Sequence, residues 1–306
     1  MASGAVSASR TAGLVTAGIL LMLLADFLFA LNDAMGKWLV ASFSVGQLLL
    51  VRSVGAFVVL SPMLARQPAA ALLRPAQPGL QLLRVVLATA DTALFYAAVV
   101  YLPLADVMTF YMAGPIWVAA MSHFCLGERV GWRRWLAIGV GFVGVLVILR
   151  PSSASLSPAS LFALLGSLSF SAALVLNRVL RDTSDAVLVG WQTAGAFLTG
   201  AVWCLWTWRT PDALGFGSLL LLGVVACCGH LLIARSLKLA PASTLAPLQY
   251  TLLLWGVVFG YAFFGDVPGV RMLVGSAIIV VAGLFIFHRQ AVVAEVPEEA
   301  VKVPLV

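Results

Sequence analysis

The sequence has few charged residues. Only 10% of its 306 residues are Asp, Glu, Lys or Arg, whereas 62% are hydrophobic. A soluble domain usually carries about a quarter charged residues, and a soluble fold of this length has too little interior to hide so much apolar surface. The composition therefore excludes an ordinary soluble protein and leaves no room for a separate soluble domain.

Motifs that carry enzyme chemistry are also missing. The sequence contains neither H-E-x-x-H nor G-x-S-x-G, and its three histidines are scattered along the chain. The four cysteines show no spacing typical of a metal site or of a disulfide framework. A membrane-embedded enzyme is the weaker alternative, and we expect no catalytic site, no metal and no soluble cofactor.

The formal net charge of +6 does not indicate a nucleic-acid partner. The basic residues occur in ones and twos between apolar segments rather than in one cluster, as expected if they set the orientation in a membrane. With the N-terminus inside, the cytoplasmic side would collect most of them, including Arg129 and Arg133. We therefore expect a multi-pass protein of the cell inner membrane with both termini in the cytoplasm.

Ten apolar segments are separated by charged or Pro- and Gly-rich breaks. They lie near residues 14–41, 46–65, 79–101, 104–124, 132–150, 158–180, 187–208, 215–238, 241–263 and 269–288. Since a bilayer core about 30 Å thick needs roughly 20 apolar residues per helix, we predict an all-α membrane protein with ten transmembrane helices. The predicted units are two five-helix repeats at 1–151 and 152–290 and a short cytoplasmic tail at 291–306.

The two halves are related in sequence by a nearly constant offset. Corresponding pairs include Pro103 with Pro241, Gly127 with Gly265, Phe29 with Phe170, and Phe57 with Phe197. An odd number of helices in each half means that the second half inserts with the opposite orientation. Such inverted repeats are typical of transporters that alternate access around a site near the membrane midplane.

Several short motifs resemble the EamA family of the drug/metabolite transporter superfamily. They are Asn32-Asp33 with Lys37, Gln47 with Arg52, Pro103-Leu-Ala-Asp106, Leu126-Gly-Glu-Arg129 and Leu149-Arg-Pro151. The second half departs from the family pattern at Gly265-Asp266, where Gly-Glu is usual. The resemblance implies ten helices in two inverted repeats that rock around a midplane cavity lined by helices 1, 3, 4, 6, 8 and 9.

The function that the resemblance implies is secondary-active transport of a small organic metabolite. Amino acids, a vitamin such as riboflavin, S-adenosylmethionine and nucleoside-like solutes are all open, and so is a multidrug efflux carrier. Neither the substrate nor the direction of transport follows from these motifs. A channel or receptor would not need a duplicated, kinked and inverted pair of halves.

Ionisable groups inside the apolar segments are the strongest candidates for the site, because such residues in membrane helices mark substrate and ion pathways. In the first segment, Asp33 follows Asn32, and Lys37 is placed to pair with Asp33 on one helical face. Asp33 is a candidate for proton coupling and Asn32 for substrate binding. The alternative for Asp33 is a structural ion pair near the outer membrane surface.

The second and third segments place Arg52 and Asp91 near mid-span. Arg52 needs an acidic partner, and Asp33 or Asp91 would serve, either as a clamp between helices or as part of a binding site. Asp91 is too deep to reach the membrane surface, so we assign it, with Tyr96, to a central polar cavity. Arg84 lies nearer the cytoplasmic end, and we expect its side chain to extend to that surface.

Two proline positions predict breaks in the fourth and ninth helices. Gly114-Pro115 and Ala246-Pro247 should each interrupt the hydrogen-bond ladder and open a kink. A cavity beside these kinks would find hydrogen-bond donors and aromatic faces for a planar solute. The candidates at these positions are Tyr111, Gln249 and Tyr250.

The eighth segment contributes His230. As a neutral imidazole it is suited to binding a solute or carrying a proton. The alternative is a histidine that is hydrogen-bonded within the bundle and has only a structural role.

The fifth segment is rich in small residues. Ala137 and Gly141 are spaced as in small-xxx-small motifs, which allow close approach of helices. We interpret this segment as scaffold or as the surface of a homodimer.

Overall fold

The structure is a computed structural model. It describes the backbone of residues 2–75, 77–102, 104–111, 113–127, 131–149 and 158–265 and short pieces between 269 and 282, with most of their side chains from residue 13 onward. The predicted tail at 291–306 lies outside the described residues, as do Glu128, Arg129 and Asp266.

All regular structure in the described part of the chain is helical. The helices are α1 (Ala2–Val40), α2 (Val45–Leu64), α3 (Ala69–Leu73), α4 (Pro78–Tyr101), α5 (Leu104–Tyr111), α6 (Gly114–Leu126), α7 (Trp132–Leu149), α8 (Pro158–Val179), α9 (Asp185–Thr207), α10 (Ala213–Leu239), α11 (Ala242–Leu245) and α12 (Thr251–Phe264), with a 3₁₀ segment, η2, at Ala246–Tyr250. Within the described residues, six helices are long and apolar enough to cross a membrane, and shorter apolar helices accompany them. The chain is therefore an all-helical, multi-pass membrane protein.

Both predicted helix breaks are present. The fourth apolar segment is divided into α5, which ends at Tyr111, and α6, which begins at Gly114. The ninth is divided into α11, the 3₁₀ segment η2 and α12. A proline removes a backbone donor and clashes with the preceding turn, which explains why each ladder is interrupted where Gly114-Pro115 and Ala246-Pro247 occur.

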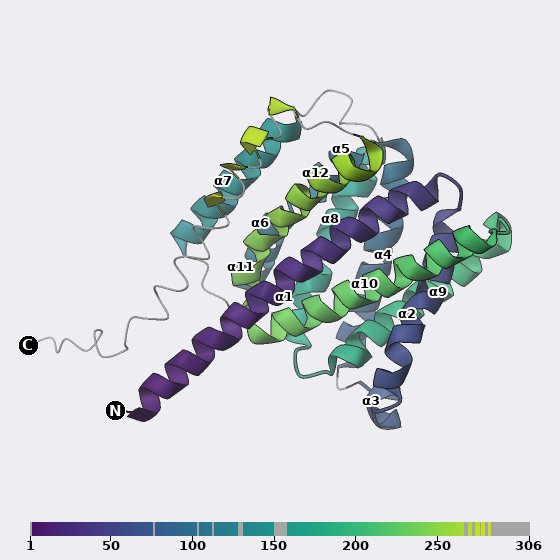
Figure 1. Ribbon diagram of the computed structural model, residues 1–306. Helices are drawn as coiled ribbons and strands as arrows, with labels where there is room; N and C mark the ends of the chain where they lie inside the picture. The colour runs from purple at the N-terminus through teal and green to yellow at the C-terminus, as the bar shows by residue number, and fades with distance from the viewer. Residues whose placement is uncertain are drawn as a thin grey trace, which may run out of the picture.

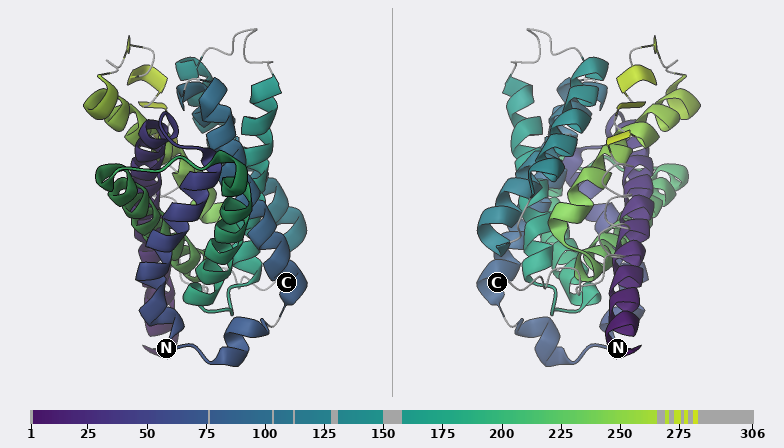
Figure 2. Two further views of the ribbon diagram at one scale, coloured as in Figure 1. Left: turned by 90° about the vertical axis from the view of Figure 1, so that its right-hand side faces the viewer. Right: turned by 90° about the vertical axis from the view of Figure 1, so that its left-hand side faces the viewer.

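The helices of the two predicted halves alternate in space rather than forming two separate bundles. α1 runs beside α10 and α12, and α4 packs along α8 (Figure 1). α2 lies against both α9 and α10. The short helix α3 lies at the end of the bundle that also holds the beginning of α1 (Figure 2). This arrangement brings residues from both halves into the centre of the bundle.

α2 and α10 approach each other closely through glycines. A Cβ atom added at Gly223 would overlap the backbone carbonyl oxygen of Arg52, and one added at Gly55 would overlap the carbonyl oxygen of Leu220. Small residues at helix contacts allow such close approach in membranes. The contact also sets the position of Arg52, because the carbonyl group that faces Gly223 belongs to Arg52.

We predict that Gly223→Ala destabilises the protein by about 1–3 kcal/mol, the usual range for overpacking. Gly217→Ala is the matched control on the same helix, because nothing lies within 4 Å of a Cβ atom at that position. The control should change stability by less than about 1 kcal/mol. Denaturant unfolding in detergent micelles measures both, and equal effects would contradict the close contact.

Candidate functional site

A cavity with about 550 Å³ of empty space lies between the helices. Its lining consists of Phe29, Asn32, Asp33, Arg52, Asp91, Thr92, Phe95, Tyr96, Met108, Tyr111, Phe170, His230 and Leu252. These side chains come from α1, α2, α4, α5, α8, α10 and α12. These helices lie in the predicted apolar segments 1, 2, 3, 4, 6, 8 and 9, in that order. The resemblance named all of these segments except the second, α2, which contributes Arg52.

Most of the residues predicted for a site come together here. The cavity contains seven of them: Asn32, Asp33, Arg52, Asp91, Tyr96, Tyr111 and His230. They are far apart in sequence, and they supply two carboxyl groups, one guanidinium, an imidazole, an amide and two phenols. The rest of the wall consists of the aromatic rings of Phe29, Phe95 and Phe170 together with Thr92, Met108 and Leu252.

Asp91 is held by a tyrosine from the next membrane segment. The hydroxyl of Tyr111 donates to Asp91 Oδ1 at 2.7 Å, which joins α4 to the end of α5. Gly166 on α8 leaves room for that hydroxyl, because a Cβ atom there would overlap Tyr111 Oη. A carboxylate with one hydroxyl donor still has acceptor sites to offer a solute.

Asn32 is held by the backbone of a neighbouring helix. Its Nδ2 donates to the carbonyl of Leu222 on α10 at 2.9 Å, so its Oδ1 faces Tyr96, whose hydroxyl lies 3.4 Å away. The ring of Tyr96 packs closely on Gly36, where a Cβ atom would overlap it. Asn32 and Tyr96 are thus both positioned by neighbouring helices.

Arg52 does not pair with either carboxylate of the cavity. Among the described residues, neither Asp33 nor Asp91 comes within ion-pair distance of the Arg52 guanidinium, so the predicted clamp is not formed. The predicted pair of Asp33 with Lys37 is also wrong, because Lys37 Nζ lies 4.3 Å from the centroid of the Phe264 ring instead. Within the part of the chain that the structure describes, Arg52 and Asp33 thus line the cavity without a direct charged partner.

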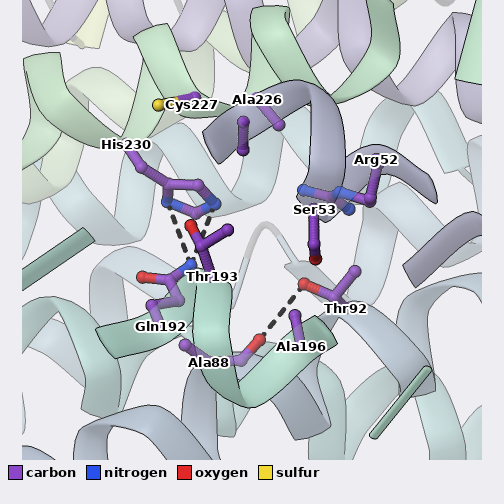
Figure 3. Close-up of a pocket in the computed structure, with 11 residues that line it drawn as sticks. Arg52, Ser53, Ala88, Thr92, Gln192, Thr193, Ala196, Ala226, Cys227 and His230 are labelled. Atoms are coloured by element: carbon purple, nitrogen blue, oxygen red, sulfur yellow. Dashed lines mark hydrogen bonds between the residues drawn. The ribbon is translucent and has the colours of Figure 1, made fainter. Parts of the chain in front are cut away.

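A second, smaller cavity of about 350 Å³ adjoins the first and shares Arg52, Thr92 and His230 with it. Figure 3 shows Arg52 and His230 reaching it from different sides, with Gln192 beneath His230. The Nε2 atom of Gln192 lies 3.0 Å from Nε2 of His230. Gln192 was missed by sequence reasoning, because a lone uncharged amide in an apolar segment gives little signal.

Gln249 and Tyr250 lie outside the lining of these cavities. The hydroxyl of Tyr250 donates to the carbonyl of Ile138 on α7 at 2.9 Å, and its ring fills the space left by Gly141. Gln249 is 2% exposed, and its amide atoms have no partner among the described residues. Gly141 of α7 thus serves a contact within the chain.

Arg84 is wholly buried, so the expectation that it extends to the membrane surface is wrong. It is 1% exposed, and its guanidinium donates to Asn177 Oδ1, to the carbonyl of Leu188 and to Gln192 Oε1. The side chain does not reach the membrane surface, because these acceptors on α8 and α9 enclose it.

The described residues contain no group of three or more His, Cys, Asp or Glu side chains that could hold a metal ion. The site consists instead of hydrogen-bonding and charged groups enclosed by membrane-spanning helices. Such groups inside membrane helices line the pathways of solutes and ions. Fold and site together define the class of membrane transport proteins.

Comparison with known proteins gives the family. The sequence profile of the EamA-like transporter family matches residues 16–150 and again residues 157–288, and the chain belongs to this family. A riboflavin transporter of Vibrio cholerae serotype O1 is 30% identical over 275 residues, covering 88% of this chain and 92% of that protein. An S-adenosylmethionine uptake transporter of Rickettsia prowazekii is 24% identical over 275 residues, covering 89% of this chain and 93% of that protein.

The fold is also similar to a solved crystal structure. That structure has a TM-score of 0.76 and 18% sequence identity, over 90% of this chain and 98% of the other. At this identity the similarity concerns the fold alone. The family and its named relatives are transporters rather than enzymes.

We predict that Tyr111→Phe lowers the free energy of unfolding by about 1–3 kcal/mol, because the partly buried carboxyl group of Asp91 loses a hydrogen-bond donor. Tyr101→Phe is the matched control, since Tyr101 is 72% exposed at the end of α4 and should change stability by less than about 0.5 kcal/mol. Denaturant unfolding in detergent micelles compares them. No loss in Tyr111→Phe would contradict the bond to Asp91.

Proposed function

We propose that this protein is a secondary-active carrier that moves a small organic metabolite by alternating access. The observation that carries the proposal is the mixed origin of the cavity lining. Asp33, Arg52 and Asp91 precede the linker between the predicted halves, whereas His230 follows it. A rocking motion of one half against the other would therefore open and close the site itself.

Contacts between corresponding residues support two inverted five-helix repeats. Phe29 and Phe170 correspond in the two halves, and their ring centroids lie 6.5 Å apart. Phe57 and Phe197 also correspond, and their centroids lie 6.4 Å apart. Two related units bring equivalent residues together where a two-fold axis passes between them, so both pairs are expected along a pseudo-two-fold axis.

The helix contacts support the same proposal. The first long helix of each half packs on the third long helix of the other, as α1 with α10 and α8 with α4. Gly127 and Gly265, which correspond, both end a helix in the left-handed conformation. We propose ten membrane spans, with α5 and α6 as the fourth, α11 to α12 as the ninth, and the tenth near residues 269–288.

The orientation follows from the distribution of basic residues. An excess of Lys and Arg marks cytoplasmic loops, and most basic residues of this chain fall on the side that includes the N-terminus. We propose that both termini face the cytoplasm and that the protein lies in the cell inner membrane. We also propose that the repeats extend over 1–151 and 152–290.

The groups in the cavity favour a solute that carries charges of both signs. Carboxyl groups of Asp33 and Asp91 are suited to a cationic group, and the unpaired guanidinium of Arg52 is suited to a carboxylate or phosphate. The rings of Phe29 and Phe170 offer apolar faces for a planar part. An amino acid or a nucleoside-like solute such as S-adenosylmethionine fits this set better than an uncharged vitamin such as riboflavin.

Protons are the proposed coupling ion, and Asp33 is the proposed carrier. Asp33 lines the cavity, and none of the described residues forms an ion pair with it. A carboxyl group in this position can exchange a proton and a cationic solute at one site, which is a common arrangement in transporters.

The proposal predicts saturable uptake and counterflow in proteoliposomes. A panel of amino acids, S-adenosylmethionine, nucleosides and riboflavin is compared with and without an imposed pH gradient. One class of solute should show counterflow and accelerate with the gradient, and Asp33→Asn should lose the response to the gradient. Counterflow is the decisive sign of a carrier, because a channel has no site that must return across the membrane.

The matched control is Asp212→Asn. Asp212 is the N-cap of α10, where its Oδ1 accepts from the Gly215 N–H at 2.8 Å, and asparagine caps helices equally well. Loss of coupling in both variants would contradict a specific role of Asp33. Riboflavin as the transported solute would contradict the charge preference but not the carrier, and absence of counterflow for every solute would contradict the carrier.

A further inference from the structure

Asp26 is a carboxyl group deep in α1 that the proposed transport site does not use. It is 1% exposed, and it lines neither of the two cavities. Its Oδ2 lies 3.0 Å from the hydroxyl oxygen of Thr251, at the point where the 3₁₀ segment η2 ends and α12 begins. A carboxyl group of the predicted first half thus meets the broken ninth segment, which belongs to the second.

None of the described residues supplies a cation to Asp26. The acidic, basic and tyrosine side chains on the helices that pack against α1 have other positions or partners: Arg52, Asp91, Tyr96 and His230 line the cavities, Arg84 bonds to α8 and α9, Arg235 and Lys238 pair with Asp185, Tyr250 bonds to Ile138, and Tyr101 and Tyr261 are exposed. An ionised carboxylate buried without a cation has a large desolvation penalty, and such a group takes up a proton instead.

The hydroxyl of Thr251 has two acceptors within reach but only one proton. Its Oγ1 lies 2.7 Å from the carbonyl oxygen of Leu248 in η2 and 3.0 Å from Asp26 Oδ2. If Asp26 were ionised, this single proton would have to serve both contacts. A protonated Asp26 instead donates to Thr251 Oγ1, and Thr251 donates to Leu248, so each contact has a proton of its own.

We propose that Asp26 is a proton-binding site separate from the cavity, and that it holds its proton while α1 packs on the junction of η2 and α12. The ligand of this site is the proton itself. A movement that separates α1 from α12 would let water reach the carboxyl group, which can then ionise because water solvates its charge. The site therefore binds a proton in one arrangement of the helices and releases it in another.

The release of the proton during transport rests on the proposed function, whereas the proton bound in the present arrangement does not. The first experiment therefore detects the bound proton directly. Infrared spectra of the protein are recorded in detergent micelles at neutral pH without any solute. The stretching band of a protonated carboxyl group is separate from the bands of a carboxylate, so the two forms of Asp26 are distinguished.

The spectrum of the natural sequence minus that of Asp26→Asn should contain a band of a protonated carboxyl group. If this difference shows only carboxylate bands, Asp26 is ionised and the proposal is overturned. Asp182→Asn is the matched control, because Asp182 is exposed in the turn between α8 and α9. Its difference spectrum should lack the protonated band, and an equal band there would show that the signal does not come from Asp26.

Thr251→Val tests the contact with the ninth segment. Valine removes the oxygen that accepts the proton of Asp26, so the protonated band should move to higher frequency, as for a carboxyl group that donates no hydrogen bond. Thr251→Ser keeps the hydroxyl, and its band should remain at the natural frequency. An unchanged band in Thr251→Val would show that Asp26 does not donate to Thr251, contrary to the proposal.

Flux in proteoliposomes tests whether the proton is released during transport. Asp26→Asn keeps a neutral group at all times, so it should retain counterflow but lose the acceleration by a pH gradient. Acceleration equal to that of the natural sequence would refute the release step. A protonated Asp26 in a protein without counterflow would refute the carrier function and leave the proton-binding site in place, and thermal unfolding verifies that each variant is folded.

Discussion

Lipid offers no hydrogen-bond partners, and this constraint shapes the whole molecule. A polar side chain inside the bundle is therefore favoured where it finds a partner within the protein or lines a cavity. Asn32 does so on the carbonyl of Leu222, Arg84 on Gln192, and Asp91 on Tyr111. Each of these bonds joins different helices, so the polar groups that create the cavity also help to hold it together.

Close helix contacts make these bonds possible. Gly223 lets α10 approach the backbone of α2 at Arg52, and Gly166 leaves room for the hydroxyl of Tyr111. Helices in lipid are not pressed together by the hydrophobic effect, and packing through small residues takes its place. The glycines therefore help to shape the site, although none of them offers a functional group.

The charge arrangement of the cavity differs from that of a structural ion-pair network. Arg52 and Asp33 line the cavity without pairing with each other, whereas Lys238 and Asp185 form an ion pair at 2.7 Å. Directly paired charges stabilise a contact, but unpaired charges in a cavity remain available to a solute. This difference separates the residues proposed for transport from those that join helices.

The sequence by itself determined the class of fold and most of the candidate residues. Long apolar segments leave only membrane helices, Gly-Pro and Ala-Pro steps break two of them, and intramembrane Asp33, Arg52 and Asp91 stand out because charge is rare in lipid. Each of these signals lies in a short stretch of sequence. They are strong because a charged group or a broken helix in lipid costs free energy.

Only the tertiary structure decided which polar groups meet. It placed Lys37 on Phe264 rather than on Asp33, buried Arg84 among acceptors from α8 and α9, and directed Tyr250 toward α7. Helical periodicity shows which face of its helix a residue occupies, but not which other helix packs against that face. Which residues become partners across a hundred positions of sequence depends on how whole helices pack. A local sequence pattern contains no information on that packing.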